Sequence, residues 1–388
     1  MLTITLPFSV EALQGALSRY LSRPTLSIEE IIPERLGGGV SGSPVYRLTV
    51  NYRYGSDSTS PSLPQPSSSD VLRLVLKRGT RHTGAILAGS ARREASFYRS
   101  LAGQLPVHTP RALLTADDVT GEPTVPLVVD APGNLAQGWD GAFDSDWVLM
   151  EALPSDVVWP QSTWTAEHYR SALTALAGLH ARWWGCPPSA SDYPWVWTPT
   201  GQHTEDLVRE ARESMLEIAG QPWGEKFFPG QRLQAWLDVL DNPACLLDTL
   251  TGMPQTLIHG DYWPGNIAMR ADGPAVFDWQ LVGVGPAPYD LACFHSSSRW
   301  WFGRLPLSLT EMRSYYLARL NEQLGYSVDR YSFDTGMDAA RAWRFAVLWP
   351  TPILEHHGSL LAQLHHMRAT AIEPAFASLR RCLGYIPH

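Results

Sequence analysis

The N-terminal part of the chain carries the alternating pattern of β-strands. Residues 45–50 alternate apolar and polar side chains, as strands do when one face is buried, and the largely apolar residues 71–77 also predict a strand. Ahead of them, residues 8–21 place apolar side chains at helical spacing, which predicts a helix. A second helix is predicted over residues 91–101, and the stretch that follows it favours strands again.

The remainder of the chain has the 3.6-residue period of amphipathic helices. Residues 165–184 place their large apolar side chains on one stripe, and several later segments repeat this pattern. Further helices are predicted over 204–219, 231–249, 309–324, 338–348 and 358–382. A β-rich part followed by a helix-rich part predicts an α+β fold with two lobes, which we divide into residues 1–152 and 153–388.

Composition supports this division and excludes several classes of protein. A chain of 388 residues is longer than one hydrophobic core normally serves, and its 44% hydrophobic content excludes global disorder. The formal net charge of −8 lacks the basic footprint that nucleic-acid binding requires. The four cysteines are far apart and no apolar run is long enough to cross a bilayer, so we expect reduced thiols in a soluble, cytoplasmic protein with no membrane partner.

The chemistry concentrates in two neighbouring segments. Residues 257–266 read LIHGDYWPGN, and residues 275–279 read AVFDW. They supply the oxygen-bearing side chains of Asp261, Asn266 and Asp278 around short apolar runs. This grouping suits magnesium-dependent phosphoryl transfer, in which one carboxylate orients a hydroxyl while an amide oxygen and a second carboxylate hold the metal. The alternative is that the Asp and Asn residues only stabilise turns.

The same segments resemble the H-G-D-x-x-x-x-N loop of the aminoglycoside phosphotransferase and choline kinase families, which share the protein-kinase-like fold. Asp278 stands where those families have the DFG aspartate, and residues 285–292 are similar to their G-D-P-x-Y-D-L-A segment. The resemblance implies a two-lobed, ATP- and Mg²⁺-dependent kinase of small molecules. It implies that Asp261 is catalytic and that Asn266 and Asp278 bind the metal, whereas we expect His259 to hold the loop in place.

Glycines between the strand-like residues 28–32 and the predicted strand at 45–50 match the phosphate-binding loop of such kinases. Gly37, Gly39 and Gly42 form G-x-G-x-x-G, and Ser41 could donate a hydrogen bond there. The next valine, Val45, comes one residue later than in the kinase pattern. A flexible turn is the alternative explanation.

Three further nucleotide contacts are implied by the resemblance. Lys77 ends a predicted strand and is the candidate lysine for the phosphates, with Glu94 of the following helix as its partner. Residues 147–153 resemble the family's hinge strand, so backbone groups around Glu151 and Leu153 are expected to meet the nucleotide base. The alternatives are a solvated lysine, a surface acid and a plain buried strand.

The resemblance implies that the phosphate acceptor is a small molecule with a hydroxyl group, and aromatic residues dominate the pocket expected for it. The candidates for acceptor binding are Trp263, His295, Trp300, Trp301 and Glu355. Tryptophan walls can stack on sugar rings, hold an apolar polycycle or surround a quaternary amine. This aromatic bias favours a neutral or weakly charged alcohol, although ordinary packing accounts equally well for any single tryptophan.

Two hypotheses from other classes remain open. A kinase-shaped binding or regulatory protein without catalysis is disfavoured because all five residues expected to bind nucleotide and metal or to act in catalysis are present. These are Lys77, Glu94, Asp261, Asn266 and Asp278. A serine hydrolase using Ser41 is disfavoured because no base or orienting acid can be placed near it by spacing. A protein kinase is a weaker variant of the main hypothesis, since no A-P-E segment follows Asp278.

Overall fold

The computed structural model describes residues 2–36, 43–54, 69–80, 84–119, 125–129, 143–153 and 164–384. The glycine-loop candidates Gly37, Gly39, Ser41 and Gly42 lie outside these described residues. The chain divides into two compact units. The first comprises Met1–Thr83, Leu87–Gly103 and Thr109–Pro154, and the second comprises Gly84–Ile86, Gln104–His108 and Ser155–His388.

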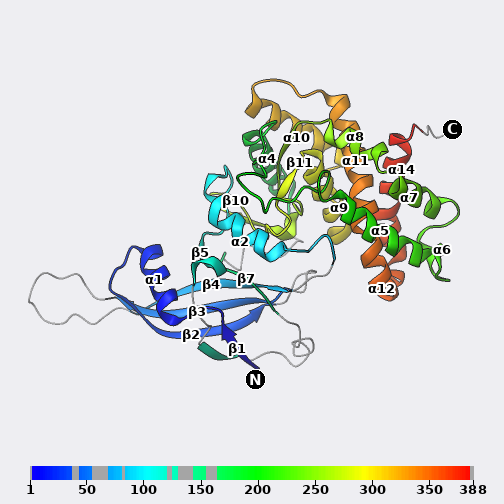
Figure 1. Cartoon of the computed structure of the whole chain (residues 1–388). Helices are drawn as coiled ribbons and strands as arrows, with labels where there is room; N and C mark the ends of the chain where they lie inside the picture. The colour runs from blue at the N-terminus through cyan, green and yellow to red at the C-terminus, as the bar shows by residue number, and fades with distance from the viewer. Residues whose placement is uncertain are drawn as a thin grey trace, which may run out of the picture. The chain divides into compact units, whose positions relative to one another are not determined.

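An antiparallel five-stranded sheet forms the body of the first unit, in the order β2-β3-β4-β7-β5 (Figure 1). Its strands are β2 (Leu26–Leu36), β3 (Val45–Tyr54), β4 (Ser69–Thr80), β7 (Phe143–Glu151) and β5 (Ala112–Thr115). The strands predicted at 45–50 and 71–77 are confirmed by β3 and β4. Alternate residues of β3, including Leu48 and Val50, are buried, as the sequence pattern requires. A smaller ladder pairs β1 (Leu2–Leu6) with β6 (Val125–Val129).

Two α-helices lie in the described part of the first unit. Helix α1 (Val10–Leu21) begins at Ser9, whose side chain accepts a hydrogen bond from the Ala12 backbone N–H, and it buries Leu13 and Leu17 in the core. Helix α2 (Ser90–Ser100) packs on β4 and β7. The predicted helices over 8–21 and 91–101 are therefore confirmed, and α2 delivers its buried side chains to the sheet.

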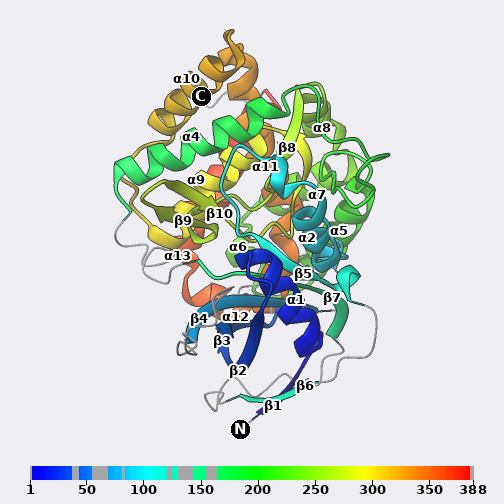
Figure 2. The same ribbon diagram turned by 90° about the vertical axis from the view of Figure 1, so that its left-hand side faces the viewer.

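Helices α4 (Ala166–Arg182) and α10 (Leu309–Leu324) run side by side in the second unit (Figure 2). Helix α10 begins with a capping box between Ser308 and Glu311, a local signal that fixes its first residue. Helix α5 (Thr204–Ala219) matches its predicted span. The predicted helices over 165–184, 204–219 and 309–324 are confirmed.

Two other helix predictions need correction. The single helix predicted over 231–249 is wrong, because α7 (Arg232–Asp241) and α8 (Ala244–Thr251) are separate. Pro243 has no backbone N–H to donate and cannot lie within a continuous helix. The helix predicted over 338–348 starts earlier, as α11 (Arg330–Leu348), since the Asp329 carboxylate caps the N–H of Ser332 at 2.7 Å.

The segment after α11 is likewise interrupted. Instead of one helix over 358–382 the chain forms shorter pieces that break at Gln363 and change to a π-helix before the last helix. These pieces are α12 (Pro350–Ala362), α13 (Leu364–Met367), the π-helix Arg368–Ile372 and α14 (Glu373–Cys382). None of the helices in the described ranges is long and apolar enough to span a membrane.

Short strands among these helices position the loops of interest (Figures 1 and 2). Strand β8 (Gln255–Ile258) pairs with β11 (Gly283–Pro286), and β9 (Ile267–Arg270) pairs with β10 (Gly273–Val276). The four-residue helix α6 (Gly224–Phe227) and the long helix α9 (Pro288–Phe302) are further helices in the described part of the second unit.

Candidate active site

The hairpin of β9 and β10 carries Asn266 and Asp278 to the same end. Ile267 is paired with Val276, and the Phe277 backbone N–H donates to the Asn266 carbonyl at 3.0 Å. Asp278 follows directly, with a positive φ of 64° that Asp tolerates better than most residues. Antiparallel pairing therefore joins two polar residues that are twelve positions apart in sequence.

Asp261 joins this pair through a direct contact. The Asn266 side-chain amide donates to the Asp261 backbone carbonyl at 2.9 Å and to its carboxylate Oδ2 at 3.0 Å. This geometry assigns the Asn266 Nδ2 to Asp261, so the Oδ1 oxygen is the atom that Asn266 can offer to a cation. Burial raises the pKa of Asp261 and the Asp278 carboxylate raises it further, while Arg344 lowers it. The charges of Asp261, Asp278 and Arg344 therefore lie close enough to interact.

The oxygen donors fit a magnesium ion. Mg²⁺ is normally held by one or two carboxylates together with water and substrate phosphates, and it prefers hard oxygen ligands. Asp278 and the Asn266 amide oxygen meet that description, and Asp261 lies beside them. Within the described ranges no group of three or more His, Cys, Asp or Glu side chains could form a different kind of metal site.

Gly260 is the residue that lets the chain turn into Asp261. Its φ is +83°, and a Cβ atom there would lie 2.2 Å from the Leu281 carbonyl oxygen. Only glycine can combine this conformation with such a close approach. The loop after β8 therefore packs directly against the segment that precedes β11.

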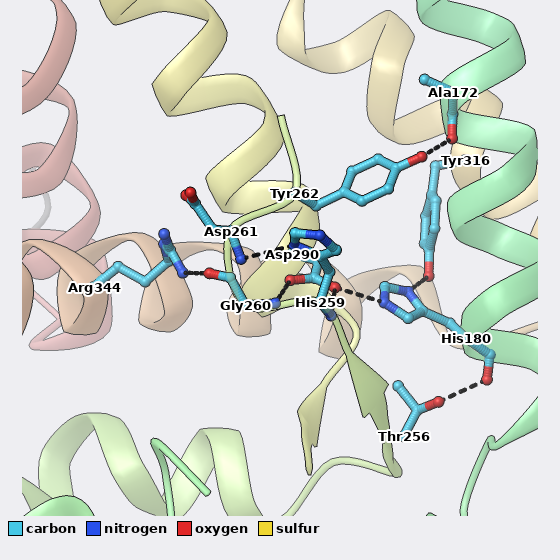
Figure 3. A network of polar contacts seen from close by, with 10 residues as sticks. All are labelled: Ala172, His180, Thr256, His259, Gly260, Asp261, Tyr262, Asp290, Tyr316 and Arg344. Atoms are coloured by element: carbon cyan, nitrogen blue, oxygen red, sulfur yellow. Dashed lines mark hydrogen bonds and ion pairs between the residues drawn. The ribbon is translucent and has the colours of Figure 1, made fainter. Parts of the chain in front are cut away.

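Asp290, in the first turn of α9, holds this turn in place. Its carboxylate accepts the backbone N–H of His259 at 2.7 Å and that of Gly260 at 2.8 Å (Figure 3). Burial alone would raise the pKa of Asp290, but the hydrogen bonds from the His180 ring and from the His259 backbone outweigh it and lower the pKa. An ionised, buried Asp290 thus fixes the backbone on the N-terminal side of Asp261.

Side chains from the helices α4 and α10 hold Asp290 in turn. His180 of α4 contacts the Asp290 carboxylate through Nε2 at 3.2 Å and the Tyr316 hydroxyl of α10 through Nδ1 at 2.6 Å. Because an ionised carboxylate only accepts, Nε2 carries the proton of that hydrogen bond. The His180 backbone carbonyl also accepts the Thr256 hydroxyl at 2.8 Å, which ties α4 to β8 (Figure 3).

His259 uses both ring nitrogens within the loop. Nδ1 accepts the Asp261 backbone N–H at 3.2 Å, and Nε2 contacts the Phe277 carbonyl at 3.0 Å. These partners assign the neutral tautomer with its proton on Nε2. His259 therefore links the loop of Asp261 to the end of β10, in the holding role expected from the sequence.

Arg344 of α11 is the main contact that sequence reasoning missed. Its Nη1 donates to the Gly260 carbonyl at 2.8 Å, and its Nη2 lies 2.9 Å from the Cys293 sulfur. The Cys293 thiol in turn lies 3.6 Å from Asp261 Oδ1. The available signal was a single arginine in the apolar run AWRFAV at 342–347, where a charge needs a partner. Cys293 gave no comparable signal.

In the first unit, Lys77 and Glu94 form an ion pair of 2.7 Å between β4 and α2. Only 13% of the lysine side chain and 2% of the glutamate side chain are exposed. Lys77 lies in register with Val45 on one neighbouring strand and Val148 on the other, so the sheet fixes its backbone. Lys77 and Glu94 therefore form a largely buried ion pair and are not two solvated surface residues.

The predicted hinge residues lie at the end of β7. The Glu151 carboxylate accepts the Tyr20 hydroxyl at 2.8 Å, and its backbone N–H donates to the Arg111 carbonyl at 3.0 Å. The Ala152 backbone N–H donates to the Arg73 carbonyl at 3.2 Å. The N–H groups of Glu151 and Ala152 thus form hydrogen bonds with backbone carbonyls of the first unit. The expected contact of Glu151 and Leu153 with a nucleotide base stays a prediction.

Among the acceptor candidates, Trp263 and Trp301 stack on each other. Their ring centroids are 5.6 Å apart with an interplanar angle of 19°. Trp263 follows Asp261 by two residues and covers Gly265, where a Cβ atom would meet the indole ring at 2.3 Å. Trp301 lies near the end of α9 and is 48% exposed, so part of this aromatic pair is accessible to solvent.

The other three acceptor candidates lie in different surroundings. Trp300 packs edge-on against Trp349. Burial and the charge of Arg341 lower the pKa of His295 to about 3, so its ring is neutral. Glu355 is on α12 with 61% of its side chain exposed, where it approaches the neighbouring histidine.

Comparison with known proteins places the chain in a family. A sequence profile described as the phosphotransferase enzyme family matches residues 66–343, which is most of the chain and includes both segments of the candidate site. The chain belongs to the phosphotransferase enzyme family. The expectation of a phosphotransferase is thereby confirmed at the level of the family.

Solved structures support the fold of this phosphotransferase. A choline kinase from Cryptosporidium parvum is 10% identical with a TM-score of 0.51, over 97% of this chain and 95% of that one. An ethanolamine kinase from Plasmodium vivax is 10% identical with a TM-score of 0.51, over 92% of this chain and 84% of that one. Likeness at this identity concerns the fold alone, and the predicted α+β, protein-kinase-like fold is confirmed.

Two curated relatives match part of the sequence. N-acetylmuramate/N-acetylglucosamine kinase from Pseudomonas putida is 38% identical over 96 residues, which are 24% of this chain and 27% of the relative. The enzyme of the same name from Pseudomonas aeruginosa is 29% identical over 69 residues, 18% of this chain and 20% of the relative. The matches thus span about a quarter or less of the length of these relatives.

Proposed function

We propose that this protein is an ATP- and Mg²⁺-dependent kinase that transfers a γ-phosphate to the hydroxyl group of a small molecule. The observation that carries the proposal is the grouping of Asp261, Asn266 and Asp278 at one end of the β9–β10 hairpin. Phosphoryl transfer needs a positioned base or orienting group and a charge-neutralising metal, and little covalent chemistry from the protein. These three residues supply that minimum.

Each residue has a distinct part in the proposed reaction. Asp261 orients the acceptor hydroxyl and takes its proton as the oxygen attacks phosphorus. Asn266 Oδ1 and the Asp278 carboxylate would hold the magnesium ion, which when bound neutralises charge on the transferring phosphate. Lys77, kept in position by Glu94, donates to the nucleotide phosphates.

For the acceptor we propose a sugar hydroxyl. The stacked pair of Trp263 and Trp301 begins two residues after Asp261 and is partly exposed at Trp301. Exposed aromatic surface suits the apolar side of a pyranose ring. The two Pseudomonas relatives are named as kinases of amino sugars, which supports the same class.

The experiment is to measure ADP formation with ATP and Mg²⁺ across sugars, amino sugars, choline-like amines and aminoglycosides. We expect turnover with a sugar, and we expect Asp261→Asn to lower kcat by about 10²–10⁴-fold, the usual range for a general base. Asparagine keeps an acceptor for the Asn266 amide, so the change removes the carboxylate with little change of shape. Near-normal turnover in this variant would contradict the assignment.

A negative result is equally informative. If the wild-type protein binds ATP by calorimetry but forms no ADP with any acceptor of the panel, a catalytically silent binding protein becomes the better description. Transfer to choline or an aminoglycoside, with none to sugars, would retain the kinase and overturn the proposed acceptor class.

A further inference from the structure

The two peptide groups that flank Gly260, the residue before Asp261, are each held by a side chain. On the N-terminal side the Gly260 N–H donates to Asp290 of α9 at 2.8 Å. On the other side the Gly260 carbonyl accepts from Arg344 of α11 at 2.8 Å. A left-handed glycine has few conformational restraints of its own, so these two side chains set the direction in which the Asp261 side chain leaves the backbone.

Arg344 also reaches the Asp261 carboxylate through a second path. Its other terminal nitrogen lies 2.9 Å from the sulfur of Cys293, and that thiol is 3.6 Å from Asp261 Oδ1. The guanidinium carbon lies 4.5 Å from the centroid of the Tyr289 ring, which fixes the plane of the group. A planar guanidinium has two terminal nitrogens, so it can contact the Gly260 carbonyl and the Cys293 thiol at the same time. An ammonium group has a single nitrogen from which to make such contacts.

We infer that Arg344 is a positioning residue for phosphoryl transfer, which orients Asp261 by holding the Gly260 carbonyl and the Cys293 thiol together. The inference rests on the proposed kinase activity. Both terminal nitrogens contact protein atoms beside Asp261, so we assign to Arg344 the positioning of Asp261.

The test compares Arg344→Met with Arg341→Met. Arg341 is the matched control because it lies one turn earlier on α11 and is buried, but its Nη1 faces Ser378 of α14 at 3.4 Å. Methionine keeps most of the apolar stem and removes the charge and the donors. We expect Arg344→Met to lower kcat by about 10²-fold, the scale of a misplaced catalytic group, with the KM for ATP nearly unchanged.

The conservative variant separates positioning from folding. Arg344→Lys keeps the charge but offers its donors from a single nitrogen, so we expect kcat to recover part of the loss. The control Arg341→Met is expected to lower the melting temperature while kcat is retained. Equal kcat losses at both arginines would mean that any disturbance of α11 harms the enzyme, and this result would overturn the inference.

A measurement without turnover guards against a variant that is merely unstable. Hydrogen exchange of the backbone amides of residues 259–261 reports directly on the held loop. We expect faster exchange there in Arg344→Met than in Arg341→Met at equal stability, and unchanged exchange would overturn the inference. If the wild-type protein has no kinase activity at all, the proposed function fails, whereas an active wild type with a fully active Arg344→Met fails the inference alone.

Discussion

The two candidate sites are built in different ways. In the first unit, one ion pair between Lys77 and Glu94 connects a sheet strand to a helix. In the second unit, the backbone before Asp261 is fixed by side chains from the loop itself and from two helices, α9 and α11. The first arrangement delivers a charge to a place, whereas the second fixes the direction of a side chain. Charge acts over distance, but proton transfer from a hydroxyl requires a short and directed contact.

This difference predicts unequal sensitivity to substitution. A point charge on a sheet tolerates small displacements because its interaction with a phosphate changes slowly with distance. A directed carboxylate does not, because a shift of about 1 Å can cost about 10²-fold in rate. Variants of the second unit should therefore reduce kcat, and variants of the first should reduce nucleotide affinity.

The largest effect is expected for Asp290→Asn. The amide keeps one acceptor oxygen, but its NH₂ group must face one of the donors that now meet the carboxylate, namely the N–H groups of His259 and Gly260 or the ring of His180. Breaking a buried charged network in this way costs about 3–5 kcal/mol. We expect a clear fall in melting temperature together with a loss of kcat, measured by calorimetry and by ADP formation.

A carboxylate elsewhere on these helices provides the control. Asp338 of α11 accepts two hydrogen bonds of 2.6 Å from Arg381 of α14. It is not part of the loop of residues 259–266. Asp338→Asn should lower stability to a smaller degree and leave kcat in place. If Asp290→Asn kept the wild-type rate, the claim that the loop depends on this support would be wrong.

The intermediate effect belongs to the first unit. Lys77→Met removes a charged donor, and a charge-assisted hydrogen bond to phosphate is worth about 1.5–3 kcal/mol, or about 10–100-fold in affinity. We expect weaker ATP binding by titration calorimetry in the presence of Mg²⁺. Glu94→Gln keeps Lys77 but removes the carboxylate that pairs with it, so we expect a smaller loss of ATP affinity. An affinity loss in Glu94→Gln larger than that of Lys77→Met would contradict the assigned order of roles.

How much of this molecule can be predicted from the sequence alone depends on how local each signal is. The residues from His259 to Asn266 form one short loop, so a single contiguous motif carries the family resemblance that groups them. Strand alternation and the Ser308–Glu311 capping box locate elements because both are local patterns. The break at Pro243 is equally local, but the apolar period on either side of it conceals the interruption.

Contacts between distant segments cannot be predicted in this way. Arg344 meets Gly260 only because α11 packs against the loop, and His180 meets Asp290 only because α4 packs against α9. No spacing rule connects residues so far apart in sequence. Helix packing decides which of several buried polar residues become partners, and that information lies in three-dimensional contacts.

The smallest effect separates the two aspartates of the second unit. The pKa of Asp261 is raised, chiefly by burial, so its ionised form destabilises the fold and this cost grows as pH rises above the unfolded pKa of about 3.9. The pKa of Asp290 is lowered, so its contribution is present above that pH and lost below it. In metal-free buffer we therefore expect Asp261→Asn to keep or raise the melting temperature at about pH 7, with a smaller gain at about pH 4.5. Differential scanning calorimetry at both pH values measures this, and a large fall for Asp261→Asn at neutral pH would show that both carboxylates hold the fold in the same way.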